Sequence, residues 1–94
     1  MTDGMVTVML SLELWDTTTK SVHHLTRTVR LAVPPRSGEA IELTPGGWSE
    51  VVRRVWHHLE DGAVAIEFAG VNYASDGEDL LADALAAGWE DDDA

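Results

Sequence analysis

The sequence contains no cysteine. This absence excludes disulfide bridges, thiol nucleophiles and every metal site built on cysteine ligands. No apolar run approaches the roughly 18 residues that a membrane-spanning helix requires. No basic segment precedes an apolar stretch near the N-terminus, so we expect no cleaved signal peptide. From these absences we expect a small cytoplasmic domain that does not bind a membrane.

Basic residues are scarce and unevenly placed. Six Lys and Arg residues stand against 17 Asp and Glu residues, which gives a formal net charge of −11. All six precede position 55, whereas residues 55–94 carry eleven acids and neither Lys nor Arg. Nucleic-acid binding depends on Lys and Arg side chains that displace counterions from phosphates. We therefore expect no nucleic-acid partner, while a basic protein partner fits the charge.

The length of 94 residues corresponds to one domain. Residues 1–89 are predicted to form a single small β-rich domain. Within it, Ser75-Asp76-Gly77-Glu78 has the form of a capping box, which predicts a helix over about residues 76–88. The acidic run over residues 90–94 is predicted to be a disordered tail.

Alternating apolar residues predict a long hairpin at the start of the chain. Residues 6–14 place every second side chain on one apolar face, which is typical of a half-buried strand. A polar turn follows, and residues 25–33 alternate again. Arg27 lies on the apolar side of this second strand, so it marks either a bulge or a side chain whose stem lies along apolar surface. A short strand with Ile41 and Leu43 facing inward is expected next.

Residues 48–60 fit two structures. As a helix, the segment would begin after Ser49 and carry an apolar stripe that includes Val52, Val55 and Leu59. As a strand, it would form a hairpin over residues 50–69 with a bulge near Arg53. The β-branched and aromatic residues and the turn at Asp61-Gly62 favour the hairpin slightly, and the helix stays open.

Together these elements predict a mainly β (α+β) fold. We expect a small five-stranded antiparallel, partly open barrel with one C-terminal helix. Three pieces resemble small uncharacterised bacterial β-barrel proteins: residues 25–33 running into Pro34-Pro35-Arg36-Ser37-Gly38-Glu39, the apolar string over residues 52–59, and the Asp61-Gly62 hairpin into residues 64–68. The resemblance covers about half of the chain. It implies the barrel and nothing about function.

Two histidine pairs are the only candidates for metal chemistry. His23-His24 and His57-His58 each point to opposite faces of a strand, so a zinc-type site would need one imidazole from each pair. Glu60 or Asp61 would supply its third ligand. The more ordinary interpretation is rim histidines. The sequence also lacks a nucleophile elbow and a phosphate-binding loop, so we predict no enzyme, no cofactor and no metal.

Tryptophans and acids supply the candidate interaction surface. Trp15 faces away from the apolar stripe of its strand, on the side of Met5 and Met9. The leading hypothesis is a non-enzymatic protein–protein interaction or self-associating module, in which this face packs on the C-terminal helix or on a second copy. The alternative is an acidic inhibitor or immunity-type protein that binds a basic partner, and a histidine-based metal-binding protein is a remote alternative. The candidate surface residues are Met5, Met9, Trp15, Trp48, Trp89, Asp76, Glu78, Asp79 and Asp83.

Overall fold

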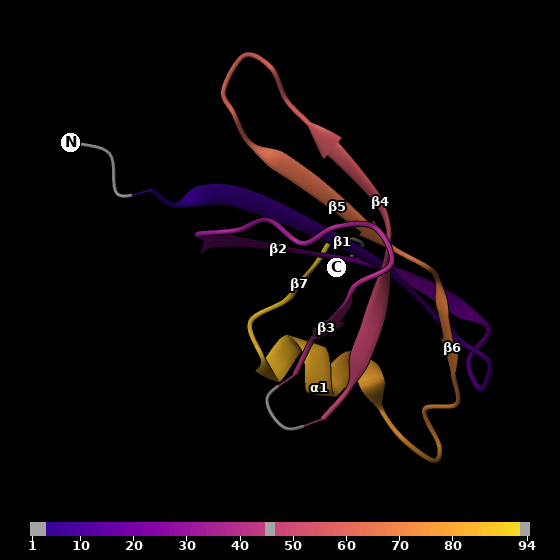
Figure 1. Cartoon of the computed structure of the whole chain (residues 1–94). Helices are drawn as coiled ribbons and strands as arrows, with labels where there is room; N and C mark the ends of the chain where they lie inside the picture. Colours follow the sequence, from indigo (N-terminus) through magenta and orange to yellow (C-terminus); the bar gives the residue numbers. More distant parts are fainter. Residues whose placement is uncertain (1–3, 45–46, 93–94) are drawn as a thin grey trace.

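The structure is a computed structural model, and it describes residues 4–44 and 47–92 (Figure 1). Its main feature is a mixed, open sheet of seven strands in the order β3-β4-β5-β1-β2-β7, with β6 also paired to β1. The elements are β1 (Val6–Asp16), β2 (Ser21–Leu31), β3 (Ala40–Glu42), β4 (Ser49–His57), β5 (Val64–Phe68), β6 (Val71–Tyr73), α1 (Leu80–Ala86) and β7 (Glu90–Asp91).

The β1–β2 hairpin confirms the first prediction. The two strands pair antiparallel in unbroken register from Val6 opposite Leu31 to Asp16 opposite Ser21. The register contains no bulge, so Arg27 stays in line opposite Leu10. Its guanidinium lies beside Gly88, which agrees with a stem that lies along the covered side of the sheet.

Residues 49–57 form a strand, so the hairpin interpretation is correct and the helical one is wrong. Strand β4 pairs antiparallel with β5, and the register shifts between Val52 and Arg54. This shift is the bulge predicted near Arg53, and a bulge bends a strand. The first half of β4 therefore pairs with β3, and its second half extends with β5 away from α1 (Figure 1). Gly62 turns this hairpin with a φ of 72°.

The mainly β fold with one helix is confirmed, and the sheet is not closed. Two details of the predicted barrel are wrong. The sheet has seven strands instead of five, and β5 and β6 run parallel to β1 instead of antiparallel. Strand β1 is 11 residues long, so two short strands fit along one of its edges. Strand β5 pairs with residues 8–11 and β6 with residues 14–16. Alternation in the sequence reports a buried face and carries no information on the direction of the neighbouring strand.

The helix and the core lie on one side of the sheet. Helix α1 buries Leu80 and Ala84. Trp89 follows it into the interior, where its ring meets Phe68 edge-on at 6.4 Å and its Nε1–H donates to the Leu43 carbonyl at 3.2 Å. The buried core comprises Val8, Leu10, Leu12, Leu14, Leu25, Leu43, Val52, Val64, Ile66, Phe68, Tyr73, Leu80, Ala84 and Trp89.

The helix is shorter than the predicted 76–88, and Asp79 caps it instead of Ser75. The Asp79 carboxylate accepts a hydrogen bond from the Ala82 amide at 3.1 Å. The Ser75 amide instead donates to Asp16 at 3.2 Å, which holds Ser75 outside the helix.

The predicted disordered tail is wrong over the residues that the structure describes. Glu90 and Asp91 form β7 on the edge of β2, and the Asp92 amide donates to the His24 carbonyl at 2.8 Å. Buried Trp89 holds this segment beside β2, and backbone pairing does not depend on side-chain charge. Asp93 and Ala94 lie outside the described residues.

No helix within residues 4–44 and 47–92 is long and apolar enough to cross a membrane.

Candidate interaction surface

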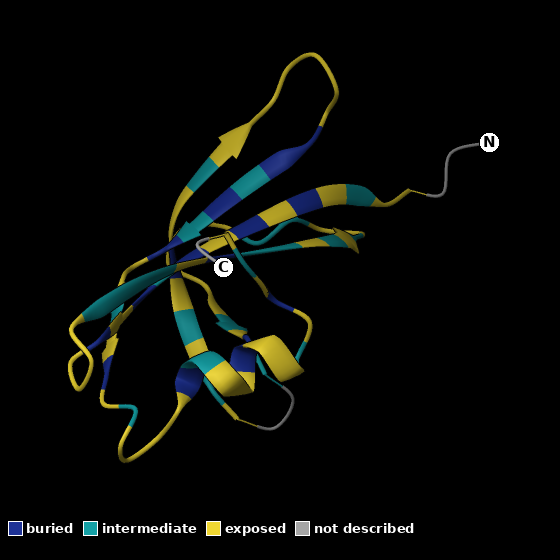
Figure 2. Cartoon of the chain, turned by 180° about the vertical axis from the view of Figure 1, so that it is seen from behind, coloured by how far each residue is buried: buried dark blue, intermediate teal, exposed yellow. Residues whose placement is uncertain are grey.

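The sheet has one covered face and one uncovered face. Successive strand residues point to opposite faces, so the residues of β1 between the core positions point away from α1. The alternating blue and yellow bands along β1 in Figure 2 show this pattern. We call the uncovered side the outer face. It comprises Thr7, Met9, Ser11, Glu13 and Trp15 of β1, Val22, His24, Thr26, Thr28 and Arg30 of β2, Arg54 and Trp56 of β4, and Ala65 and Glu67 of β5.

Large apolar side chains are exposed on the outer face. Trp15 is 47% exposed, Trp56 40% and Met9 38%, and Met5 is 40% exposed just before β1. Helix α1 packs on the opposite face, so the idea that it covers Trp15 is wrong. Trp56 stands opposite Ala65, which stands opposite Met9. In a strand, neighbouring residues point to opposite faces. The inward position of Val55 is therefore the feature of the sequence that places Trp56 on the outer face.

Two of the candidate tryptophans do not belong to the outer face. Trp89 is 3% exposed and lies in the core. Trp48 is half-buried against the core, and its Nε1–H donates to Glu50 at 2.8 Å. Both rings follow glycines at the ends of elements, so sequence spacing does not reveal whether they turn inward.

The middle of the outer face is polar. The Glu13 carboxylate accepts a hydrogen bond from Trp15 Nε1 and lies 3.0 Å from His24 Nε2. Glu67 Oε1 lies 3.8 Å from a guanidinium nitrogen of Arg53. Glu13, His24, Arg53 and Glu67 line a shallow cavity of about 280 Å³. Each carboxylate therefore stands beside a basic side chain, and the sheet surface carries little excess negative charge.

The acidic candidates lie elsewhere. Asp76, Glu78, Asp79 and Asp83 are exposed on the segment before α1 and on α1 itself. Asp76 accepts a hydrogen bond from Thr18 at 3.1 Å, and Asp79 caps the helix. The structure therefore separates the predicted interaction surface into two parts, the outer face and this acidic segment.

The two histidine pairs do not converge. His23 and His24 lie on β2, whereas His57 lies on β4, and β1 and β5 stand between these strands. Within the described ranges, no group of three or more His, Asp or Glu side chains could hold a metal ion.

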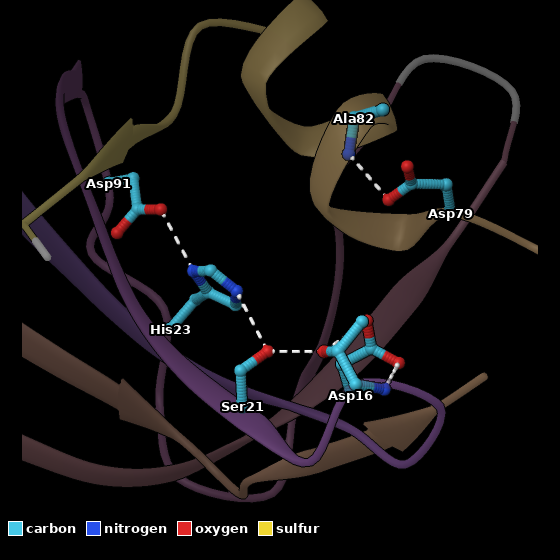
Figure 3. Close-up of polar contacts among 7 residues, drawn as sticks. Asp16, Ser21, His23, Asp79, Ala82 and Asp91 are labelled. Carbon is cyan, nitrogen blue, oxygen red and sulfur yellow. Dashed lines mark hydrogen bonds and ion pairs between the residues drawn. The ribbon is translucent and has the colours of Figure 1, made fainter. Parts of the chain in front are cut away.

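Ser21, His23 and Asp91 come together in an arrangement that no sequence motif indicates (Figure 3). His23 Nδ1 lies 3.0 Å from Asp91 Oδ2, and His23 Nε2 lies 3.4 Å from Ser21 Oγ. The order matches a Ser-His-Asp triad. However, Ser21 Oγ also contacts the Thr19 hydroxyl, which itself donates to Asp16. Because the Thr19 hydroxyl donates to Asp16, the Ser21 hydroxyl donates to Thr19, and Ser21 and His23 together link β7 to the β1–β2 turn.

Asp16 is the buried end of this chain of contacts. It is 5% exposed and accepts hydrogen bonds from the Thr18 amide at 2.9 Å, the Thr19 hydroxyl at 2.9 Å and the Ser75 amide at 3.2 Å. Burial by itself raises the pKa of Asp16, but hydrogen bonds from Ser75, Thr19 and Thr18 outweigh it and lower the pKa to about 2. This carboxylate joins the hairpin turn to the segment before α1.

Comparison of the chain with protein-family models, with curated proteins and with solved structures finds no match.

Proposed function

We propose that this chain is a non-enzymatic interaction module that self-associates through the outer face of its sheet. One observation carries the proposal: Trp15, Trp56 and Met9 are 47%, 40% and 38% exposed on a face that α1 leaves uncovered. Aromatic and methionine side chains are enriched in protein interfaces, and apolar groups gathered on one face mark interaction sites. The cytoplasm is the compartment that we propose for this module.

The charge on the outer face favours a second copy as the partner. Glu13 and Glu67 stand beside His24 and Arg53, respectively. The exposed acids before and within α1 are not part of the outer face, because α1 packs on the covered side and Asp76 contacts Thr18 in the β1–β2 turn. Two copies that meet through their outer faces therefore keep most of their negative charge apart, despite a net charge of −11 each.

The size of the outer face indicates a weak dimer. Strands β1, β2, β4 and β5 have 11, 11, 9 and 5 residues. With a rise of about 3.3 Å per residue and about 4.8 Å between strands, they cover about 570 Å². This area is below the roughly 800 Å² per partner of a standard protein interface, so we expect an equilibrium between monomer and dimer.

Sedimentation velocity over a range of protein concentrations tests the proposal. We expect a monomer–dimer equilibrium that changes little between low and high salt, because an apolar contact is weakly screened. The Trp15→Ser variant should shift the equilibrium to monomer. Val33→Ser removes an apolar side chain that is 73% exposed outside the outer face, so it is the matched control and should dimerise normally. A chain that stays monomeric at every concentration, or a dimer unaffected by Trp15→Ser, would overturn the proposal.

The acidic segment supports a second candidate function, inhibition or binding of a basic protein. Asp76, Glu78, Asp79 and Asp83 are all exposed within a span of eight residues. A basic partner retained from lysate at low salt, and lost both at high salt and in an Asp76→Asn/Glu78→Gln/Asp83→Asn variant, would support it. A partner that the triple variant retains would contradict it.

A further inference from the structure

Three of the six basic residues of this acidic chain line one groove. Arg36, Arg53 and Arg54 border a groove of about 380 Å³ together with Pro35, Ser37, Val55 and His57. The groove lies between the loop that follows β2 and the second half of β4. No carboxylate borders it among the described residues. A chain with a net charge of −11 has therefore gathered positive charge at one site.

The arginines of this groove are only partly engaged. Arg53 lies 3.8 Å from Glu67, and the Arg54 guanidinium lies over the Trp56 ring at 5.3 Å. The Glu39 carboxylate accepts a hydrogen bond from the Arg36 backbone amide, not from its guanidinium. No partner of the Arg36 guanidinium is found within the described part of the chain. Its donors are available to a ligand that carries carboxylates, which arginine binds through two parallel hydrogen bonds.

The groove also exposes the edge of a strand. On the side away from β5, β3 pairs with β4 only from Ser49 to Val51. Gly38 and Glu39 then bond the backbone of Val52, and the Ser37 hydroxyl donates to the Arg53 carbonyl. From Arg54 to His57 no described strand pairs with this edge. Backbone N–H and C=O groups on such an edge can pair with an added strand.

We propose that this groove binds an extended acidic segment of a partner protein, which adds to the open edge of β4. Four residues of open edge span about 13 Å, enough for a segment of four or five residues. In an added strand, every second side chain points to the same side. Carboxylates at alternate positions would then reach the arginines, while the backbone pairs with β4. The segment continues the line of pairing that β3 and residues 38–39 begin.

Fluorescence anisotropy with a labelled synthetic heptapeptide tests this proposal. The probe carries Glu at alternate positions, with Val and Thr between them. We expect it to bind the wild-type protein more weakly as salt increases. The same peptide with Gln in place of Glu should bind about tenfold more weakly or worse, since it loses the charge-assisted hydrogen bonds. A peptide with N-methyl groups at alternate backbone positions should also lose binding, because it cannot pair with the edge.

Two charge-reversing variants test the site. Arg36→Glu and Arg54→Glu should each weaken binding of the Glu peptide by about tenfold or more. Lys20→Glu makes the same change of charge in the β1–β2 turn, outside the groove, and should leave binding unchanged. Thermal unfolding followed by circular dichroism checks that all three variants fold. Because all three side chains are exposed, we expect the midpoints of the variants to stay close to that of the wild type.

Several outcomes would overturn the proposal. Equal binding of the Gln peptide would show that charge is not recognised, and equal binding of the N-methylated peptide would show that no strand is added. Tighter binding of an oligothymidylate than of the Glu peptide would assign the groove to nucleic acid. No binding of any probe would mean that the arginines only protect an edge strand from aggregation. Arg54 belongs to the outer face as well as to the groove, whereas Arg36 borders only the groove, so the Arg36→Glu result leaves the dimer proposed above to its own test.

Discussion

Asp16 is the only charged residue that is buried within residues 4–44 and 47–92. A buried carboxylate costs free energy unless hydrogen bonds compensate for the lost water. Here two threonines of the turn and the Ser75 amide supply them. Residues that are 59 positions apart in the sequence are thereby joined by one side chain.

The lowered pKa of Asp16 predicts how stability depends on pH. Its value of about 2 in the folded protein lies below the ordinary 3.8, so the unfolded chain binds the proton more readily. The stabilising contribution is complete above about pH 4 and is lost as the pH falls toward 2. Thermal midpoints of the wild type and of Asp16→Asn should differ at neutral pH and converge over this range. A difference that stays constant down to pH 2 would contradict the assignment.

Among the elements, β7 shows how a packed side chain organises a charged segment. Glu90 and Asp91 have low strand propensity, yet they pair with Thr26 and Leu25. Trp89 is buried immediately before them, and His23 lies 3.0 Å from Asp91. The burial of Trp89 and the contact of Asp91 with His23 therefore hold this segment as a strand despite its low strand propensity.

Shortening Trp89 should release this element. Trp89→Ala removes a buried ring and should lower the free energy of unfolding by about 3–5 kcal/mol. Trp89→Phe keeps an aromatic ring near Phe68 but leaves the Leu43 carbonyl without its indole donor, which should cost about 1–3 kcal/mol. Urea unfolding measures both values, and amide exchange at Asp91 and Asp92 reports on β7. Equal losses for the two variants would show that the ring packing contributes little.

At the scale of the whole molecule, charge is segregated. The chain extends over 49 × 26 × 25 Å, and three of its basic residues gather beside β4. Exposed acids occupy the segment before α1 and α1 itself. The 17 carboxylates outnumber the six Lys and Arg residues, which leaves a formal net charge of −11. Repulsion among them works against the compact state.

We therefore expect salt to stabilise the protein. Screening shortens the range of repulsion from about 30 Å in dilute buffer to about 8 Å at physiological ionic strength. The thermal midpoint should rise with added NaCl, and most steeply at low concentration. Measuring it at a protein concentration too low for association separates this effect from dimerisation. A midpoint that falls with salt would mean that the few ion pairs outweigh the repulsion.

Part of this fold was predictable from local pattern. The β1–β2 hairpin, the bulge near Arg53 and the exposed position of Trp15 each follow from alternation within one strand. Burial on one face of a strand imposes a period of two on its residues, so a single segment contains the information. The scarcity of Lys and Arg likewise determines the acidic character of the chain, because net charge depends on composition alone.

The tertiary structure decided what depends on contacts between distant residues. Three features depend on segments that are far apart in the sequence. They are the parallel pairing of β5 and β6 with β1, the burial of Trp89, and the contact between His23 and Asp91. The groove beside β4 likewise joins the loop that follows β2 to an edge strand. A sequence shows which side chains of a segment favour the core and which favour water. It does not record which other segment completes that core, because many pairings satisfy the same period.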